Sequence, residues 1–270
     1  MNATAPGLVA LDDEDDTVTT VITGGVLAWD SCALTDVGKQ RRINEDACLK
    51  HARDALWVVA DGMGGHAKGD VASSGIVSAF GALDFPERLS ACADLAEDTL
   101  TDLNGQFRAL ADFGRDGATV GSTVVVLLAR LSYVLFLWVG DSRLYRSRQG
   151  QFEQMTQDHS QVEELISQGL LRRADAESHP NANVVTRAVG AADEIYVDLD
   201  YREVTIGDRF LLCSDGLTKE VPETEIAAIL AQDADAATLC RRLLDRTLSG
   251  TARDNVTVIV VIAQAGQDAP

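Results

Sequence analysis

The chain has 270 residues, of which 46% are hydrophobic, and this content is typical of a folded globular protein rather than a disordered one. Its formal net charge of -19 excludes the basic surface that nucleic-acid binding needs, so we expect no nucleic-acid partner. No apolar run reaches membrane-spanning length, so we expect no membrane association. Five scattered cysteines without a CxxC pair indicate reduced thiols, and we expect a cytoplasmic protein.

The N-terminal segment differs in character from the rest of the chain. Residues 12–16 are five consecutive carboxylates, and such runs are usually solvated. We therefore expect residues 1–25 to form an acidic, flexible tail. No linker, repeat or low-complexity segment interrupts the remainder, which predicts one domain over residues 26–265.

The first half of this domain alternates between β-rich and helical patterns. Hydrophobic alternation and short apolar runs predict strands over 26–35 and 55–61, and helical spacing predicts helices over 69–83 and 89–113. Two further β runs at 118–130 and 132–141 lead into a hairpin over 142–155 that turns at Gln149–Gly150.

The second half continues in the same way. An amphipathic helix is expected over 158–168, with Asp158 or Ser160 as its N-cap, then strands over 194–204 and 208–215. Helices over 223–230 and 236–248 precede a last strand at 255–263. Short turns between consecutive strands favour antiparallel sheets, and adjacent helix pairs favour layers that cover them, so we expect an α+β sandwich.

Acidic residues mark the ends of several strongly apolar runs. They are Asp61, Asp141, Asp215 and Asp254, together with the adjacent pair Glu45 and Asp46 beside another candidate strand. Converging carboxylates repel one another, so either some bind protons or a cation neutralises them. An all-oxygen ligand set favours Mg²⁺ or Mn²⁺, and a pair of such ions is suited to the attack of water on a phosphate ester. The purely structural alternative for Asp61–Gly62 is a tight hairpin turn.

The chain resembles bacterial members of the PPM (PP2C-like) family of metal-dependent protein serine/threonine phosphatases. The segments that carry the resemblance occur in family order and cover nearly everything after the tail: TDVGKQRRINEDA, VVADGMGGHAKGDVAS, GSTVVV, WVGDSRLYR, MTQDHSQVEELISQGLL, HPNANVVTRAVG, LLCSDGLT and ARDNVTVIVV. The resemblance implies a four-layer α-β-β-α sandwich with two central antiparallel sheets.

The resemblance also implies a metal site and its ligands. Two ions, Mn²⁺ or Mg²⁺, are expected to bind tightly, and a third more weakly. Asp61 would bridge the tight pair with help from the Gly62 carbonyl, Asp215 and Asp254 would hold the first ion, and Glu45 the second. Asp46 would orient metal-bound water. The complete expected set is Glu45, Asp46, Asp61, Gly62, Asp141, Asp215 and Asp254, in which Asp141 and Asp215 hold the third ion.

The implied chemistry is in-line attack of a metal-bridging hydroxide on phosphoserine or phosphothreonine, without a covalent phospho-enzyme. Arg41 would bind the phosphate, with Arg42 as its rival. His66 or metal-bound water would protonate the leaving oxygen, and the alternative for His66 is a loop residue that only tunes the site. Asp70 is expected to cap the helix that follows it. Asp158 and His159 are expected to fix the start of a helix.

The expected partners are phosphorylated Ser/Thr proteins and a cognate bacterial Ser/Thr kinase, and we expect a monomer. The resemblance places a mobile flap within residues 158–190, and this exposed, charged segment is suited to substrate selection. Two other function classes remain at this point. One is a non-catalytic signalling module on the same fold, and the other is a two-metal phosphatase for small molecules.

Overall fold

The structure is a computed structural model, and it describes residues 9–10, 19–22, 25–51, 54–63, 68–113, 120–176 and 178–266. Two expectations, the general acid His66 and the carboxylate run of residues 12–16, lie outside the described residues.

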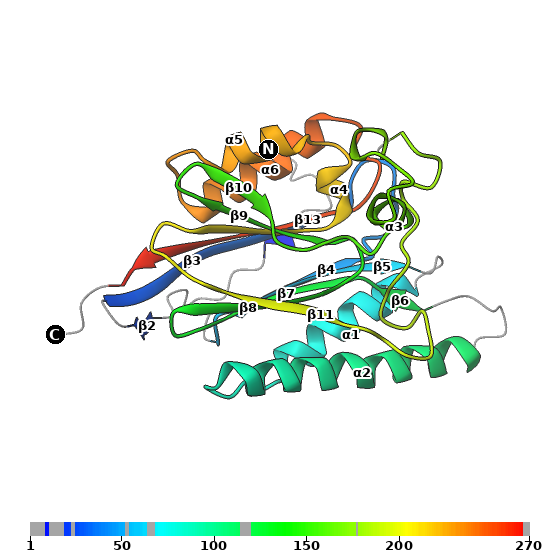
Figure 1. Ribbon diagram of the computed structural model, residues 1–270, viewed down its shortest axis with the longest axis horizontal. Coiled ribbons are helices and arrows are strands. Elements are labelled where there is room, and N and C mark those ends of the chain that lie inside the picture. The colour runs from blue at the N-terminus through cyan, green and yellow to red at the C-terminus, as the bar shows by residue number, and fades with distance from the viewer. Residues whose placement is uncertain are drawn as a thin grey trace, which may run out of the picture.

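Two antiparallel sheets form the centre of the molecule (Figure 1). The first has the order β1-β3-β13-β12-β9-β10, and β2 also pairs with β3. Its strands are β1 (Val9–Ala10), β2 (Thr19–Ile22), β3 (Gly25–Asp36), β9 (Arg143–Arg148), β10 (Gln151–Gln154), β12 (Arg209–Cys213) and β13 (Val256–Ala265). The second has the order β11-β8-β7-β5-β4, and β6 pairs with β5. Its strands are β4 (Asp46–His51), β5 (Leu56–Met63), β6 (Gly121–Ser122), β7 (Val124–Arg130), β8 (Tyr133–Val139) and β11 (Asp198–Glu203).

Helices cover the outer face of each sheet. The helices α5 (Glu223–Leu230) and α6 (Ala236–Ser249) lie over the first sheet, and α1 (Gly69–Gly81) and α2 (Leu89–Phe113) lie under the second (Figure 1). Three short helical segments, α3 (Gln161–Ser167), η2 (Arg173–Asp175) and α4 (Asp215–Thr218), complete the described helices. The predicted four-layer α-β-β-α sandwich is confirmed.

Three apolar clusters fill the spaces between the four layers. The cluster between the sheets contains Trp29 of β3 and Trp57 of β5, whose ring centroids are 5.5 Å apart in an edge-to-face arrangement. A second cluster joins the second sheet to α1 and α2, and a third cluster joins the first sheet to α4, α5 and α6. Both faces of the central strands are therefore buried, which explains why these strands are near-continuous apolar runs.

The N-terminal residues differ in part from the expected tail. Within residues 1–25, β1 and β2 pair with β3, so part of this segment extends the first sheet. The run Thr17–Thr23 is rich in β-branched residues, a composition suited to an added strand.

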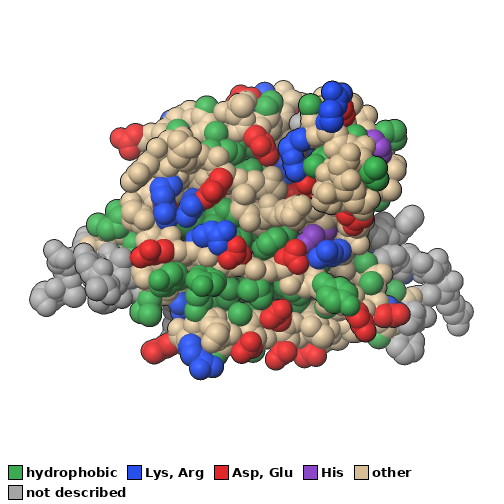
Figure 2. Space-filling model, viewed as in Figure 1, with side chains coloured by type: hydrophobic (Ala, Val, Ile, Leu, Met, Phe, Trp, Pro, Cys, Tyr) green, Lys and Arg blue, Asp and Glu red, His purple; other side chains and the backbone are tan. Residues whose placement is uncertain are grey.

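The surface carries charge of both signs around the sandwich (Figure 2). Apolar side chains gather over β8 and β11 on the face shown there. The exposed apolar side chains of these strands include Tyr133 and Tyr201, whose rings are 6.2 Å apart. In the described part of the chain, no helix combines the length and the apolar character that crossing a membrane requires.

Candidate active site

Strand β5 carries Asp61 from the core to one end of the sandwich. The preceding residues 56–60 are fully buried and apolar, and Asp61 is the first acidic residue after them. Its backbone is held from the side: the Asp61 N–H donates to Thr123 Oγ1 at 3.2 Å, and its carbonyl accepts from the Thr123 N–H at 2.9 Å. The starting point of the Asp61 side chain is therefore fixed by the segment that connects β6 to β7.

Gly62 and Gly69 allow three segments to approach closely beside Asp61. A Cβ atom on Gly62 would lie 2.1 Å from the Gly69 carbonyl oxygen, and one on Gly69 would lie 2.6 Å from Glu45 Oε1. The hairpin turn considered for Asp61–Gly62 is wrong, because β5 continues to Met63. The glycines instead pack β5, α1 and Glu45 against one another.

Asp46 faces Asp61 across the sheet, because the register of β4 and β5 pairs these two residues. Its Oδ2 accepts from the hydroxyls of Ser214 and Thr257, each at 2.7 Å. Its Oδ1 is buried without a hydrogen-bond partner. One oxygen of Asp46 is thus anchored, and the other is left for a ligand.

Asn255 holds the loop that leads to Glu45. Its Nδ2 donates to the carbonyls of Val37 at 2.9 Å and Ile43 at 3.0 Å, and its Oδ1 accepts from the Glu45 N–H at 2.8 Å. Glu45 Oε1 is buried without a partner. Asn255 directly follows Asp254, so one short segment both supplies a carboxylate and orients a second.

Asp215 and Asp254 lie at the same end of the first sheet, and both pair with the ammonium group of Lys219. Asp215 begins α4, and Lys219, one turn further on, pairs with Asp215 and lies 3.5 Å from Asp254 Oδ2. Arg41 Nη2 lies 2.8 Å from Asp254 Oδ1, with about half of its side chain exposed (48%). Asp215 Oδ1 is buried without a partner.

Asp141 follows β8 after a glycine whose backbone conformation and close packing disfavour any side chain. Gly140 has φ of +112°, and a Cβ there would lie 2.6 Å from the Thr123 side chain. Thr123 Oγ1 also lies 2.7 Å from the buried Ser142 hydroxyl. Thr123 therefore contacts both the Asp61 backbone and the segment that carries Asp141.

The carboxylates raise one another's pKa. Burial raises the pKa of Asp46 and that of Asp141 to about 7, and nearby carboxylates, Asp215 in both cases, add to the effect. Burial, followed by Asp46, Asp215 and Asp141, raises the pKa of Asp61 well above its usual value. Burial also raises the pKa of Asp215, against the opposing effect of Lys219. The cluster needs protons or cations near neutral pH.

The donor set suits a hard divalent cation. Three carboxylate oxygens are buried without hydrogen-bond partners, Glu45 Oε1, Asp46 Oδ1 and Asp215 Oδ1, and such oxygens are ligands of Mg²⁺ and Mn²⁺. Among the described residues, no three His, Cys, Asp or Glu side chains are already arranged around one point as a metal-binding group. Lys219 and Arg41 pair with Asp215 and Asp254 instead, so an ion bound there would displace these contacts.

The structure brings together most of the residues that the sequence singled out. Those that meet at this end of the sandwich are Arg41, Glu45, Asp46, Asp61, Gly62, Asp141, Asp215 and Asp254. Asp70 is not the N-cap of α1, because the helix begins at Gly69 and Asp70 lies within its first turn. Ser160, rather than Asp158, caps α3, and its side chain accepts from the Glu163 N–H.

Sequence reasoning missed Lys219 and Asn255. Burial opposes the charge of Lys219, but Asp215 and Asp254 raise its pKa above the usual value. Its place one turn after Asp215 becomes a signal only once α4 is recognised as a helix. The signal for Asn255 was its position beside Asp254 in the motif DNVT.

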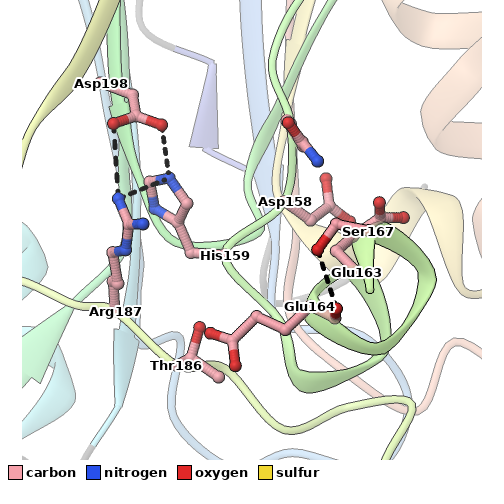
Figure 3. Close-up of a pocket in the computed structure, with 9 residues that line it drawn as sticks. Asp158, His159, Glu163, Glu164, Ser167, Thr186, Arg187 and Asp198 are labelled. Atoms are coloured by element: carbon pink, nitrogen blue, oxygen red, sulfur yellow. Dashed lines mark hydrogen bonds and ion pairs between the residues drawn. The ribbon is translucent and has the colours of Figure 1, made fainter. Parts of the chain in front are cut away.

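A small polar cavity of about 150 Å³ lies beside α3 (Figure 3). Its lining includes Asp158, His159, Arg187 and Asp198. His159 and Arg187 both point toward the Asp198 carboxylate, as the close-up shows.

Comparison with known sequences gives consistent matches. The family model for protein phosphatase 2C matches residues 38–251. Serine/threonine protein phosphatase PstP of Mycobacterium tuberculosis (strain CDC 1551 / Oshkosh) is 35% identical over 228 residues, which are 84% of this chain and 44% of that protein. Serine/threonine phosphatase stp of Listeria monocytogenes (serovar 1/2a, strain EGD-e) is 34% identical over 247 residues, 87% of this chain and 97% of that protein. The chain thus spans less than half of PstP and nearly all of stp.

Solved structures agree with the sequence matches. PppA, a key regulatory component of T6SS in Pseudomonas aeruginosa, superposes with a TM-score of 0.81 at 38% identity, over 91% of this chain and 100% of that chain. The catalytic domain of PstP in complex with two manganese ions superposes with a TM-score of 0.78 at 32% identity, over 88% and 99% of the two chains.

Proposed function

The chain belongs to the protein phosphatase 2C family, and we propose that it hydrolyses phosphoserine and phosphothreonine in proteins with the help of divalent metal ions. The observation that supports this proposal is the convergence of buried carboxylates, three of them with unpartnered oxygens, at one end of the sandwich. A filled set of acidic residues favours an enzyme over a non-catalytic module. The names of the relatives favour protein substrates over small molecules.

The proposed ligands follow the family pattern. Asp61 and the Gly62 carbonyl would help to hold two ions, with Asp215 and Asp254 for the first and Glu45 for the second. A weaker third ion would bind at Asp141 with Asp215. When bound, Mn²⁺ or Mg²⁺ supplies a water molecule of lowered pKa and neutralises the negative charge of the phosphate. The PstP catalytic domain binds two manganese ions, and this supports Mn²⁺ as a metal that the site can use.

The chain's own side chains would orient the reactants. Asp46, anchored through Oδ2 by Ser214 and Thr257, would offer its unpartnered Oδ1 as a hydrogen-bond acceptor to orient water. Arg41 would exchange its contact with Asp254 for the phosphate oxygens, to which its planar fork of N–H donors is well suited. His66 would protonate the leaving oxygen. We further propose that a cognate Ser/Thr kinase supplies the substrates and that the protein acts as a cytoplasmic monomer.

The test is the release of phosphate from a phosphothreonine peptide across a Mn²⁺ titration. Asp61→Ala should lower turnover by more than about 100-fold, the upper end of the effect seen when a residue that only supports a metal ligand is lost. The matched control is Asp235→Ala, which removes the exposed N-cap of α6 and should leave turnover unchanged. Full activity in the folded Asp61 variant would contradict the assignment. A folded wild-type protein that releases no phosphate at any Mn²⁺ concentration would contradict the proposed function itself.

A further inference from the structure

His159 has a buried side chain that the proposed chemistry does not use. Only 6% of it is exposed, and its ring stacks on Trp138 with the centroids 6.2 Å apart and the planes at 18°. The start of α3 does not need this side chain, because Ser160 caps the helix and Asp158 pairs with Arg143. The expected role of His159 in fixing the helix therefore leaves its imidazole unexplained.

The hydrogen bonds of His159 determine which nitrogen carries the proton. The Gly140 N–H donates to Nδ1 at 3.0 Å, so Nδ1 is an acceptor and carries no proton. The proton is then on Nε2, which lies 3.1 Å from Asp198 Oδ2 and donates to it, whereas Arg187 Nη1 lies farther from the same Nε2, at 3.5 Å (Figure 3). An imidazolium would direct two N–H groups at each other across the contact with Gly140. Burial lowers the pKa of His159, which agrees with a neutral ring.

The contact with Gly140 is double. The His159 N–H donates to the Gly140 carbonyl at 2.9 Å, so this glycine is bound through both of its backbone polar groups to one residue. On its other side, Gly140 packs against Thr123, whose hydroxyl accepts from the Asp61 N–H. Gly140 is thus clamped between His159 and a residue that holds Asp61, and Asp141 is the next residue in the chain.

We propose that neutral His159, protonated on Nε2 and anchored by Asp198 of β11, is a positioning residue that fixes Gly140 and thereby aims the Asp141 carboxylate at the metal site. The inference rests on the proposed function, because it assigns Asp141 to an ion. Arg187 supports the arrangement from the rim of the cavity, since its Nη1 lies 3.4 Å from Asp198 Oδ1. His159 itself touches neither substrate nor metal in this arrangement.

The tautomer is tested first, in the metal-free wild-type protein. A long-range ¹H–¹⁵N NMR spectrum of the imidazole should show a neutral His159 with its proton on Nε2 at neutral pH. A proton on Nδ1, or an imidazolium, would overturn the inference. This measurement needs neither activity nor a variant that folds.

Two substitutions separate the two ring nitrogens. His159→Asn places an amide oxygen near the Nδ1 position and keeps an acceptor for Gly140, whereas His159→Gln reaches the Nε2 position and leaves the Gly140 N–H without its acceptor. His159→Gln should accelerate hydrogen exchange at the Gly140 amide. It should also lower the affinity for the most weakly bound Mn²⁺ by about 10-fold or more, as loss of a ligand-supporting group does. His159→Asn should retain both properties to within a factor of about three. The control His51→Gln lies at the opposite end of β4 from Asp46 and should change neither.

The outcomes are distinct from those of the phosphatase test. Equal weakening of Mn²⁺ binding in the Asn and Gln variants, or unchanged binding in both, would overturn the positioning role. A wild-type protein that binds Mn²⁺ but releases no phosphate would contradict the proposed function alone, because ion binding and Gly140 exchange still report on His159. A wild-type protein that binds no Mn²⁺ would overturn both proposals.

Discussion

Arg41 stands at the rim of the carboxylate cluster, where its guanidinium neutralises Asp254 and remains half exposed to solvent. A phosphorylated substrate has to approach a protein of net charge -19, so a local cation is needed to attract it. The same guanidinium can serve both carboxylate and phosphate, because each offers two oxygens in a plane that matches its donors.

We expect Arg41→Ala to raise KM for a phosphopeptide about tenfold or more with a smaller change in kcat, because a charge-assisted hydrogen bond to bound substrate is lost. Arg41→Lys should recover only part of the loss, since lysine offers a point charge rather than a fork. Steady-state kinetics with Arg42→Ala as the control check this. An equal rise of KM in the Arg42 variant would show that the neighbour binds the phosphate.

Asn255 shows how a residue with no expected chemical role can support the site. Asn255→Ala should destabilise the protein by about 1–3 kcal/mol, because it leaves the Glu45 N–H and two carbonyls without partners. Asn104 is a matched control, since its buried amide accepts from the Gly190 N–H and donates to the Ala192 carbonyl. Urea unfolding should show similar losses for both alanine variants. Only the Asn255 variant should lose Mn²⁺ affinity. An equal loss of Mn²⁺ affinity in the Asn104 variant would contradict the role of Asn255 at Glu45.

Asp61, Asp141, Asp215 and Asp254 were predictable from sequence because each one ends or begins a strongly apolar run. Glu45 and Asp46 were noticed as an adjacent acidic pair beside a candidate strand. The partners of these residues were not predictable in the same way. Ser214 and Thr257 bind Asp46 from positions 168 and 211 residues away, and no local pattern records such pairing. The resemblance to a family supplied the roles, and the hydrogen bonds now show which oxygens are left free.

At the scale of elements, two helices were predicted with their full bounds. The expected helices over 89–113 and 223–230 have the bounds that the structure gives α2 and α5. The short helix α4 was missed, because four residues are too few to show a helical period. The β run over 118–130 is divided into β6 and β7, because Gly121 and Ser122 pair with Met63 and Gly62 on β5.

The segment after α3 is tied to that helix by charge. Arg173 contacts both carboxylate oxygens of Glu163, at 2.5 and 2.7 Å, and Arg172 pairs with Asp175. Replacing residues 172–183 with a neutral loop should change kcat/KM for phosphoproteins and spare a small aryl phosphate, because only a large substrate reaches an exposed loop. A second replacement that keeps Arg173 serves as the control. Equal effects on both substrates would contradict substrate selection by this segment.

For the whole molecule, the carboxylate cluster where the two sheets meet should lower the free energy of unfolding at neutral pH when no metal is bound. The pKa of Asp46 and of Asp141 is about 7 in the folded protein, whereas an unfolded aspartate has a pKa near 3.9. Between these values the folded state binds more protons, so the free energy of unfolding should fall as pH rises from about 5 to 7.5.

Urea unfolding in EDTA at pH 5 and pH 7.5 measures this decrease. Asp46→Asn should make it smaller, because the variant has no carboxyl to deprotonate at this position. Added Mn²⁺ should restore stability at pH 7.5 more than at pH 5, since it replaces the missing protons. A wild-type protein equally stable at both pH values without metal would contradict the account.

An α+β sandwich was predictable from consecutive strands and adjacent helix pairs, and the family resemblance implied its four layers, but the pairing order of the strands was not predictable. β3 pairs with β13, the last strand, over ten consecutive residue pairs. Hydrophobic patterning indicates that each strand is buried and leaves its neighbour undetermined. The resemblance to a known family implied two antiparallel sheets and did not indicate which strands pair.

The long pairing of β3 with β13 also has a consequence for the protein during its synthesis. Asp254 and Asn255 immediately precede β13, while the loop that they hold lies more than two hundred residues earlier. A ribosome-bound chain lacking its last strand therefore carries Glu45 without its anchor and the first sheet without its central member. The proposed site can therefore form only once residues 254–265 have been synthesised and β13 has paired with β3.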